Sequence, residues 1–470
     1  MAVLSIRLAL LGILSLAVHM AAARPTPWTM AARSLGEDPS KDPFYQPPTG
    51  FEEEAPGTIL RSRSVVASFL GLIPDPVEAH QLLYRTTAIN GSAISSVSTV
   101  FKPLNAKKDR FVSFQTAYDS SSPTCNPSVQ YQLGTPPTDL ISSLEMIIFQ
   151  AYLLLGYVVT SSDYEGPDAA FSAGRLAGTG VLDGIRATTN YHDVLGFSNS
   201  SPMVVGVGYS GGAIATGWAA ELQPTYAPEL DVKGWAMGGT PANLTGTLLV
   251  LDDAPFSGFI PAAIVGLSKP SAYGASLNPI IDRIITDEGR EKLHVAETQC
   301  APVDLISFFE QSLFSTDVQK MGDKILQDPT IADILSNNIM GVDQNAKPTA
   351  PVFMYHAAED EIIPYANATT LRDSWCSRNV DVSFTTHDSG GHATAEVFAV
   401  PDAIQFVEAA FSGKTDRGCP EKSEFDNKLN PLALGVELEP ILVKLIDVLA
   451  KAGDKDQNIK NNIKVLEQTV

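Results

Sequence analysis

The stretch 203–221 constrains this chain more than any other. It begins with a short run of β-branched and apolar residues, stops at Gly-Tyr-Ser-Gly-Gly (208–212), and continues as an alanine-rich segment with helical character. This order predicts a strand, a sharp turn and a helix. Gly208 and Gly212 suit such a turn, because a side chain at either position would collide with the neighbouring strand or helix. The turn would expose the hydroxyl of Ser210 above the sheet, so Ser210 is the candidate nucleophile.

Strands and helices alternate along most of the chain. Upstream of the turn, the residue pattern predicts strands at 82–87 and 93–103 joined by Asn90-Gly91, a strand at 111–119, a helix at 139–155 with apolar residues on every face, a strand at 156–160 and a helix at 173–188. Asn-Gly between two such runs is a hairpin signal. The alternation predicts an α/β fold with a mostly parallel central sheet covered by helices.

A long interval after the turn lacks the strand pattern. It follows a strand at 232–237 and reaches to about residue 351. Its short helical segments lie at 278–285, 303–309 and 331–335. We interpret this interval as a helical cap inserted over the active face of the sheet. The sheet resumes at 352–356, and 379–387 is predicted to be its last strand.

These patterns divide the chain into six parts. We expect a secretory signal peptide at 1–23, a leader or extended arm at 24–55, a sheet-containing core at 56–240 and 351–430, the cap at 241–350, and a C-terminal helical tail at 431–470. The signal peptide is inferred from one positive charge, an apolar stretch and Ala-Ala-Ala at its end. The tail is expected to dock on the body of the protein, because the face opposite its apolar stripe is not basic. The protein is therefore expected to be secreted.

The charge of the chain limits its partners. The formal net charge is −21, and no cluster of Lys or Arg offsets the acidic surface. This argues against nucleic acid and anionic membrane surfaces as partners. No apolar run is both long and uninterrupted enough to cross a bilayer, so we expect no integral membrane span.

Four cysteines remain after the signal peptide, at Cys125, Cys300, Cys376 and Cys419. Their spacings do not fit a zinc site, and secretion favours two disulfides, for which three connectivities are possible. Neither a metal nor a cofactor is expected. Candidate N-glycosylation sequons begin at Asn90, Asn199, Asn243 and Asn367.

A nucleophilic serine needs two partners. A histidine must take its proton, and a carboxylate must fix the tautomer of that histidine and stabilise its charged form. After a turn of this kind the carboxylate and then the histidine are expected further along the chain, each on a loop after a strand. Asp360 is the candidate carboxylate, because a short side chain in a tight turn can be held by backbone amides and aimed inward. Its neighbours Glu359 and Glu361 are expected to be solvated, and a purely structural acidic turn is the alternative.

Two histidines follow the last predicted strand. His392 lies on a glycine-containing loop tip before a helix-like start and is the candidate base, with His387 at the strand end as the runner-up. His192, His294 and His356 precede the candidate carboxylate and are interpreted as structural. The observed order of serine, acid and histidine predicts a serine hydrolase.

The candidate oxyanion hole uses the backbone N–H of Gly211, the residue after the nucleophile. A second donor is expected from a loop after an earlier strand. Asp119 closes such a strand, although it is equally suited to capping a turn.

These motifs resemble those of the fungal secretory lipases, the family of the Candida lipase A. The similar segments are PGTILRSR at 56–63, YRTT at 84–87, DYEGP at 163–167 with Gly174-Arg175, GYSGG at 208–212, GGTP at 238–241 and DEIIP at 360–364. The similarity covers nearly all of the mature chain up to about Phe411. The C-terminal tail has no matching counterpart.

The resemblance implies an α/β-hydrolase fold whose helical cap shields an acyl-binding tunnel. It implies hydrolysis of triacylglycerols and other carboxylic esters through an acyl-enzyme. Carried over to this sequence, it gives a catalytic triad of Ser210, Asp360 and His392, and an oxyanion hole of Gly211 and a protonated Asp119. It also implies two disulfides, Cys125–Cys300 and Cys376–Cys419. The expected partner is a lipid or ester substrate at an oil–water interface, and a monomer is favoured.

Other functions on the same fold are the alternatives to a lipase. An esterase, an acyltransferase or a peptidase would use the same three residues. A non-catalytic lipid-binding protein would not need them, so the intact serine, aspartate and histidine argue against that role.

Overall fold

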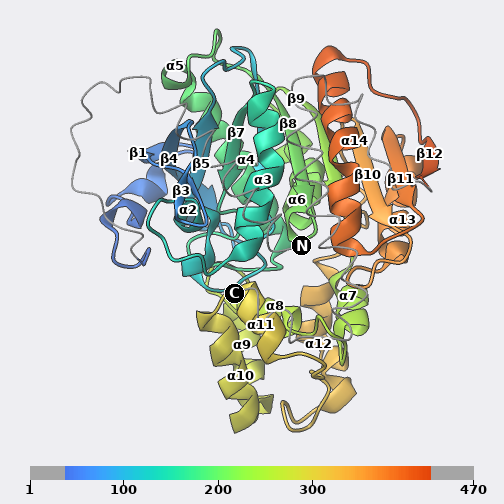
Figure 1. The fold of residues 1–470 in the computed structure, drawn as a ribbon. Helices are drawn as coiled ribbons and strands as arrows, with labels where there is room; N and C mark the ends of the chain where they lie inside the picture. Colours follow the sequence, from blue (N-terminus) through green and yellow to red (C-terminus); the bar gives the residue numbers. More distant parts are fainter. Residues whose placement is uncertain (1–37, 425–470) are drawn as a thin grey trace, which may run out of the picture. The chain divides into compact units, whose positions relative to one another are not determined.

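A computed structural model gives the structure of residues 38–424 (Figure 1). The predicted signal peptide at 1–23, the first part of the predicted leader and the predicted tail at 431–470 lie outside the described residues. In the rest of the predicted leader, Phe44 packs against Leu83 and Val97, so this part of the chain lies on the sheet.

The strands are β1 (Ile59–Val65), β2 (Ser68–Phe69), β3 (Ile73–Pro74), β4 (Glu78–Thr87), β5 (Ala93–Lys102), β6 (Arg110–Gln115), β7 (Val158–Ser162), β8 (Met203–Tyr209), β9 (Val232–Gly238), β10 (Val352–Ala357), β11 (Val382–His387) and β12 (Glu421–Glu424). The α-helices are α2 (Pro127–Gln130), α3 (Leu140–Leu154), α4 (Gly174–Asn190), α5 (His192–Leu195), α6 (Gly211–Tyr226), α7 (Leu244–Leu251), α8 (Phe259–Leu267), α9 (Gly274–Ile284), α10 (Asp287–Thr298), α11 (Ala301–Ser307), α12 (Pro329–Ser336), α13 (Tyr365–Ser377) and α14 (His392–Ser412). The 3-10 helices are η1 (Pro43–Tyr45), η2 (Phe51–Glu53), η3 (Pro123–Cys125) and η4 (Gly322–Gln327).

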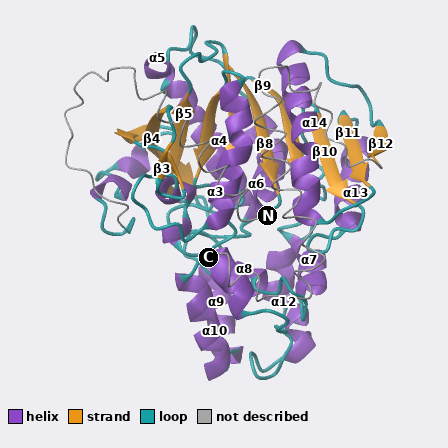
Figure 2. Ribbon diagram, viewed as in Figure 1, coloured by secondary structure: helices purple, strands orange, loops and turns teal. Residues whose placement is uncertain are grey.

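One ten-stranded sheet organises the described residues. Its order is β1-β4-β5-β7-β6-β8-β9-β10-β11-β12, while β2 and β3 form a separate hairpin. The pairs from β1 to β7 are antiparallel, including the predicted hairpin of β4 and β5, and every pair from β7 to β12 is parallel. Figure 2 shows the sheet with its covering helices. The mostly parallel α/β sheet predicted from the sequence is therefore confirmed.

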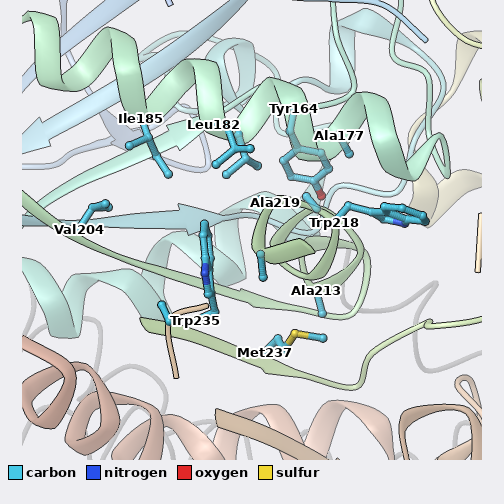
Figure 3. Close-up of a cluster of buried hydrophobic side chains, with 14 of the residues drawn as sticks. Tyr164, Ala177, Leu182, Ile185, Val204, Ala213, Trp218, Ala219, Trp235 and Met237 are labelled. Carbon is cyan, nitrogen blue, oxygen red and sulfur yellow. The ribbon is translucent and has the colours of Figure 1, made fainter. Parts of the chain in front are cut away.

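Alternate residues of the central strands face two different helical layers. Trp235 of β9 packs with Trp218 of α6 and with side chains of α4 (Figure 3). The next residue, Ala236, belongs to a second cluster with Phe149 of α3 and Ile404 of α14. Successive side chains of a strand point to opposite faces, so both faces of this sheet are buried. The parallel strands end at one edge, where their loops can meet.

Residues 239–351 form a helical insert between β9 and β10. They contain α7 to α12 and add no strand to the sheet. The predicted segments at 278–285, 303–309 and 331–335 overlap α9, α11 and α12. Helices α7 and α8 are apolar on nearly every side, so a periodic pattern does not mark them.

The structure corrects two strand predictions. β6 ends at Gln115, and the predicted end of that strand is instead a loop in which Asp119 has a φ of 44°. The strand at the end of the predicted sheet, β11, is followed by β12, which pairs with it in parallel. β12 has the sequence Glu-Lys-Ser-Glu, and without apolar residues it gives no strand signal. A disulfide from Cys376 to Cys419, two residues before β12, ties this segment to α13.

Helix α3 is not buried on every side, although apolar residues occupy all its faces. Met146, Phe149 and Tyr152 pack on the sheet, whereas Leu140 and Leu144 are exposed. Helix α3 is therefore buried against the sheet on one side, as its apolar residues indicate, and its outer side is exposed. No helix within residues 38–424 is long and apolar enough to cross a membrane.

Candidate active site

The turn after β8 holds Ser210 in a backbone conformation that few residues adopt. Its φ is 51° and its ψ is −122°, a combination that persists only where the surrounding structure enforces it. A Cβ at Gly208 would lie 2.5 Å from the carbonyl oxygen of Gly212, and one at Gly212 would lie 1.9 Å from that of Gln115 in β6. The close approach of α6 to two strands therefore requires glycine at both positions, for the reason predicted from the sequence.

Three side chains from different loops form one hydrogen-bonded chain. Ser210 Oγ lies 2.8 Å from His392 Nε2, and His392 Nδ1 lies 2.7 Å from Asp360 Oδ2. Ser210 follows β8, Asp360 follows β10, and His392 begins α14 after β11. A neutral imidazole bonded to Asp360 carries its proton on Nδ1, which leaves Nε2 free to accept the serine proton. The arrangement can therefore activate the hydroxyl as a nucleophile.

Asp360 is held as a carboxylate. Its Oδ1 accepts hydrogen bonds from the backbone N–H groups of Ile362 at 3.0 Å and Ile363 at 2.7 Å, and His356 Nε2 lies 3.2 Å from its Oδ2. Burial opposes ionisation, but His392, His356 and their hydrogen bonds outweigh it, so the pKa of Asp360 lies well below its usual range. His356, interpreted from sequence as structural, thus contacts the acid directly.

The same carboxylate acts on the histidine. Burial alone would favour the neutral imidazole, yet the charge and hydrogen bond of Asp360 outweigh burial and raise the pKa of His392 above its ordinary value. The imidazolium that forms when His392 takes a proton is therefore stabilised in place.

Two further groups position His392. Glu361, expected to be solvated, is partly buried, and its Oε2 accepts a hydrogen bond of 2.9 Å from the backbone N–H of His392. The two loops approach so closely that a Cβ at Gly391 would lie 2.1 Å from that oxygen. The hydroxyl of Tyr209 donates to the carbonyl oxygen of His392 at 2.7 Å. Glu359 is exposed, as expected.

The carboxyl group of Asp119 lies beside the start of α6. A Cβ at Gly211 would lie 1.6 Å from Asp119 Oδ1, which has no hydrogen-bond partner among the described residues. The first N–H groups of a helix also lack partners within the helix. Burial raises the pKa of Asp119 to about 7, with His392 opposing the rise and Glu396 adding to it. A protonated Asp119 and the Gly211 N–H can both donate to an oxygen placed between them.

A pair of buried carboxyl groups near this site has no counterpart among the sequence predictions. The side chains of Glu145 in α3 and Glu396 in α14 are hydrogen-bonded to each other, a contact in which one carboxyl group must carry a proton. Burial raises the pKa of both. Glu396 lies four residues after His392 on one helix, a spacing that could have revealed it. Glu145 comes from a distant part of the chain, and no local pattern marks it.

An apolar cavity of about 150 Å³ adjoins Ser210. Asp119, Ser210 and Gly211 form its polar end, while α7, α8, α9, α12 and η4 of the helical insert supply most of its walls. The wall residues are mainly leucine and isoleucine, joined by Ile362 and Ile363 after β10. Each CH₂ group buried in such a lining contributes about 0.8 kcal/mol, so the cavity suits a hydrocarbon chain.

The remaining predicted residues lie outside the hydrogen-bonded chain. His387 ends β11, where its buried Nε2 has no hydrogen-bond partner among the described residues. The structure contains two disulfides, Cys125–Cys300 and Cys376–Cys419. Of the four sequons, Asn90 and Asn199 are exposed, whereas Asn243 and Asn367 are partly buried. Asn243 Oδ1 accepts the Gly246 N–H at 3.2 Å and so caps α7.

Comparison with known proteins adds relatives in sequence and in structure. Residues 131–418 match the family model described as secretory lipase. The chain is 38% identical over 470 residues to a secreted triacylglycerol lipase of Malassezia furfur, covering 98% of this chain and 99% of the relative. A secreted triacylglycerol lipase of Malassezia globosa is 37% identical over 460 residues, covering 97% and 98%.

A solved structure shares the fold over most of the chain. Candida antarctica lipase A in its closed state aligns with a TM-score of 0.78 and 30% identity, covering 88% of this chain and 96% of that chain. The chain therefore has the α/β-hydrolase fold.

Proposed function

This chain belongs to the secretory lipase family, and from that premise we propose that it is a secreted lipase in which Ser210 is the nucleophile, His392 the base and Asp360 the supporting carboxylate. Its substrates are triacylglycerols and other carboxylic esters. The observation that carries the proposal is the hydrogen-bonded chain of these three side chains at the polar end of an apolar cavity. Such a pocket, apolar with a few convergent polar groups, suits an ester with a long acyl chain.

Hydrolysis proceeds in two halves on these residues. His392 Nε2 takes the proton of Ser210 as Oγ bonds to the ester carbonyl carbon, and the imidazolium then gives that proton to the departing alcohol oxygen. Water attacks the acyl-serine in the same way, which releases the fatty acid and regenerates Ser210. In each half the carbonyl oxygen becomes negative and accepts hydrogen bonds from the Gly211 N–H and the protonated Asp119. Asp360 stays ionised throughout.

The helical insert, which lies in the sequence between the two parts of the core, is the cap over this reaction centre. Its helices supply the apolar walls of the cavity, so the acyl chain leaves water as it enters. The reacting carbonyl group stays at the polar end, where the loops after β6, β8, β10 and β11 meet.

Hydrolysis of p-nitrophenyl esters from acetate to palmitate, beside emulsified triolein, tests the proposal. The wild-type protein is expected to hydrolyse the long-chain esters and triolein, and Ser210→Ala to lose about 10⁴-fold or more in kcat. Ser172→Ala is the matched control, because Ser172 also lines the cavity and also has a positive φ, of 68°. Activity confined to short soluble esters would contradict a lipase, and full activity of Ser210→Ala would contradict the nucleophile.

A further inference from the structure

One surface close to the active site has exposed apolar side chains, and the carboxyl groups of the segments that form it are buried. It is built from the β2–β3 hairpin, the first half of α3 and helix α11. Leu72 and Ile73 at the hairpin are 72% and 52% exposed, and Leu70 beside them is also exposed. Leu144 of α3 is 45% exposed and Ile306 of α11 is 53% exposed. We call this surface the apolar face.

The three elements of the apolar face are neighbours in space. The hairpin contacts the loop before α3, since Gly134 donates its N–H to the carbonyl oxygen of Gly71 at 2.7 Å. It also contacts α3 itself, because Gln150 Nε2 donates to Asp75 Oδ2 at 2.7 Å. Helix α3 also contacts α11. The Cys125–Cys300 disulfide fixes the start of α11 to the core.

The segments that build the apolar face, 66–77, 127–149 and 300–309, contain no Lys or Arg. Their charged residues are Asp75, Asp139, Glu145 and Asp304, and all four are buried. Burial raises the pKa of Asp75 to about 6 and that of Asp139 and Asp304 to about 7. Within these bounds no charged side chain is exposed, in a chain with a net charge of −21; the exposed Glu78 and Glu310 follow the first and the third segment directly.

Helix α10 shows that the lack of exposed charged side chains is specific to the apolar face. It contacts α11 and α8 within the same helical insert, yet its sequence is DEGREKLHVAET and its outer side exposes Glu288, Arg290 and Glu291. A helix that simply meets water carries such residues. The outer sides of α3 and α11 lack such residues within 127–149 and 300–309, and an exposed apolar patch of this kind marks a candidate interaction surface.

The elements of the apolar face also border the reaction centre. Glu145, on the inner side of α3, is close enough to Asp119 for its charge to act on it. Helix α11 packs against α8, and α8 supplies Phe259, Ile264 and other walls of the cavity. The same elements thus face the cavity or the oxyanion residue on one side and the solvent on the other.

We propose that the apolar face docks the protein on the surface of a neutral lipid aggregate, from which the ester substrate enters the active site. This inference rests on the proposed lipase function, which requires the enzyme to meet a substrate that is insoluble in water. An uncharged apolar surface matches a neutral lipid, because moving its side chains out of water is favourable and leaves no charge unsolvated. The acidic remainder of the protein would repel an anionic surface.

Binding to triolein droplets coated with phosphatidylcholine tests the proposal, measured by flotation in the Ser210→Ala background so that no substrate is consumed. The triple variant Leu72→Asp, Leu144→Asp and Ile306→Asp is expected to bind at least about tenfold more weakly. The control carries Leu104→Asp, Val194→Asp and Val342→Asp, at sites that are 95%, 46% and 55% exposed but lie outside the apolar face. It is expected to bind within about twofold of its parent.

Two further measurements separate docking from folding and from catalysis. With Ser210 intact, the triple variant is expected to hydrolyse p-nitrophenyl acetate as fast as the wild type while losing triolein hydrolysis. The wild-type chain is expected to bind droplets less well when phosphatidylglycerol replaces part of the phosphatidylcholine, a result that needs no variant.

Several outcomes would overturn the docking proposal. Unchanged droplet binding by the triple variant, equal loss in the control, or stronger binding to anionic droplets would each contradict it. A change from dimer to monomer in sedimentation, with droplet binding retained, would assign the face to a second copy of this chain. If the wild type hydrolysed no ester while the triple variant still lost droplet binding, the lipase function would fail and the docking face would stand.

Discussion

The loops after β6 and β10 each bring a buried carboxyl group to His392, and the pKa values of these two aspartates are shifted in opposite directions. Asp360 lies between His392 and His356 and accepts two backbone hydrogen bonds, so its pKa is lowered. Burial raises the pKa of Asp119 to about 7 and Glu396 adds to the rise, while Asp119 Oδ1 has no hydrogen-bond partner within residues 38–424. Burial opposes ionisation of both carboxyl groups, and the neighbouring groups decide the difference.

Because their pKa values differ, the two aspartates can perform two different functions with the same type of side chain. An ionised aspartate can stabilise an imidazolium, whereas a protonated one can donate a hydrogen bond to an oxyanion. The active site needs both within reach of a single histidine. The following variants test this division, beginning with the largest expected effect.

Asp360→Asn removes the negative charge while keeping the size of the side chain. The amide can donate to Nδ1 and so favour the wrong imidazole tautomer, and we expect kcat for p-nitrophenyl butyrate to fall about 10⁴-fold. The control is Glu359→Gln, the exposed neighbour, which should leave kcat unchanged. If Asp360→Asn kept more than a tenth of the wild-type rate, the assigned role of this loop would be wrong.

Asp119 is expected to respond in the opposite way to the same chemical change. Asp119→Asn keeps an N–H donor and should retain most of the activity measured near pH 6. Asp119→Ala removes the donor and should lower kcat about 10²- to 10³-fold. A loss in Asp119→Asn as large as that in Asp119→Ala would show that donation by this side chain is not its function.

The pH dependence of stability should be set by the buried carboxyl groups whose pKa is raised, because they outnumber those whose pKa is lowered by partners such as His392. Burial raises the pKa to about 7 for Asp119, Asp139, Asp163, Glu221 and Asp304. Such a group stabilises the fold fully below its unfolded pKa near 4, and this contribution is lost as the pH rises through the folded value. Asp360, with a lowered pKa, contributes in the opposite direction. The raised groups are more numerous, so Tm should fall by roughly 5 °C or more between about pH 5 and pH 8.

Calorimetry at a fixed scan rate measures this fall. Asp304→Asn provides the matched variant, because both carboxyl oxygens of Asp304 are buried and neither has a hydrogen-bond partner in the described part of the chain. It should make the dependence of Tm on pH shallower. A Tm that rose from pH 5 to pH 8 would contradict the raised pKa values.

Glu396→Gln and Glu361→Gln should have smaller effects, which distinguish the titration of Asp119 from that of His392 in the pH–rate profile. The charge of Glu396 raises the pKa of both Asp119 and His392, whereas that of Glu361 acts on His392. Glu396→Gln should therefore move both limbs of the pH–rate profile to lower pH, by less than about one unit. Glu361→Gln should move the acidic limb alone. Identical shifts in the two variants would be inconsistent with this assignment.

The sequence predicts those parts of the site that depend on local pattern and chain order. Ser210 is marked by its strand–turn–helix setting, and Asp360 and His392 by their order after it. Their meeting follows from the parallel sheet, since loops after parallel strands gather at one edge. Gly208 and Gly212 are also explained by local geometry.

The parts that the sequence does not predict depend on contacts between distant segments. Glu361 accepts a hydrogen bond from His392 because two loops converge, and nothing in its own neighbourhood indicates this. The Glu145–Glu396 pair joins two helices that meet only in the folded chain. The apolar pattern of α3 predicts burial, but a pattern alone cannot distinguish a side that packs on a sheet from one that meets another surface.

The dependence of kcat/KM on pH, compared between the wild type and Asp119→Asn with a soluble ester, tests the opposite ionisation of the two aspartates most directly. The acidic limb reports His392, which must be neutral to act as a base, and the alkaline limb reports Asp119, which must be protonated to donate. We predict that Asp119→Asn loses the alkaline limb, which begins near pH 7 in the wild type, and keeps the acidic limb. An alkaline limb that is the same in both proteins would contradict the account.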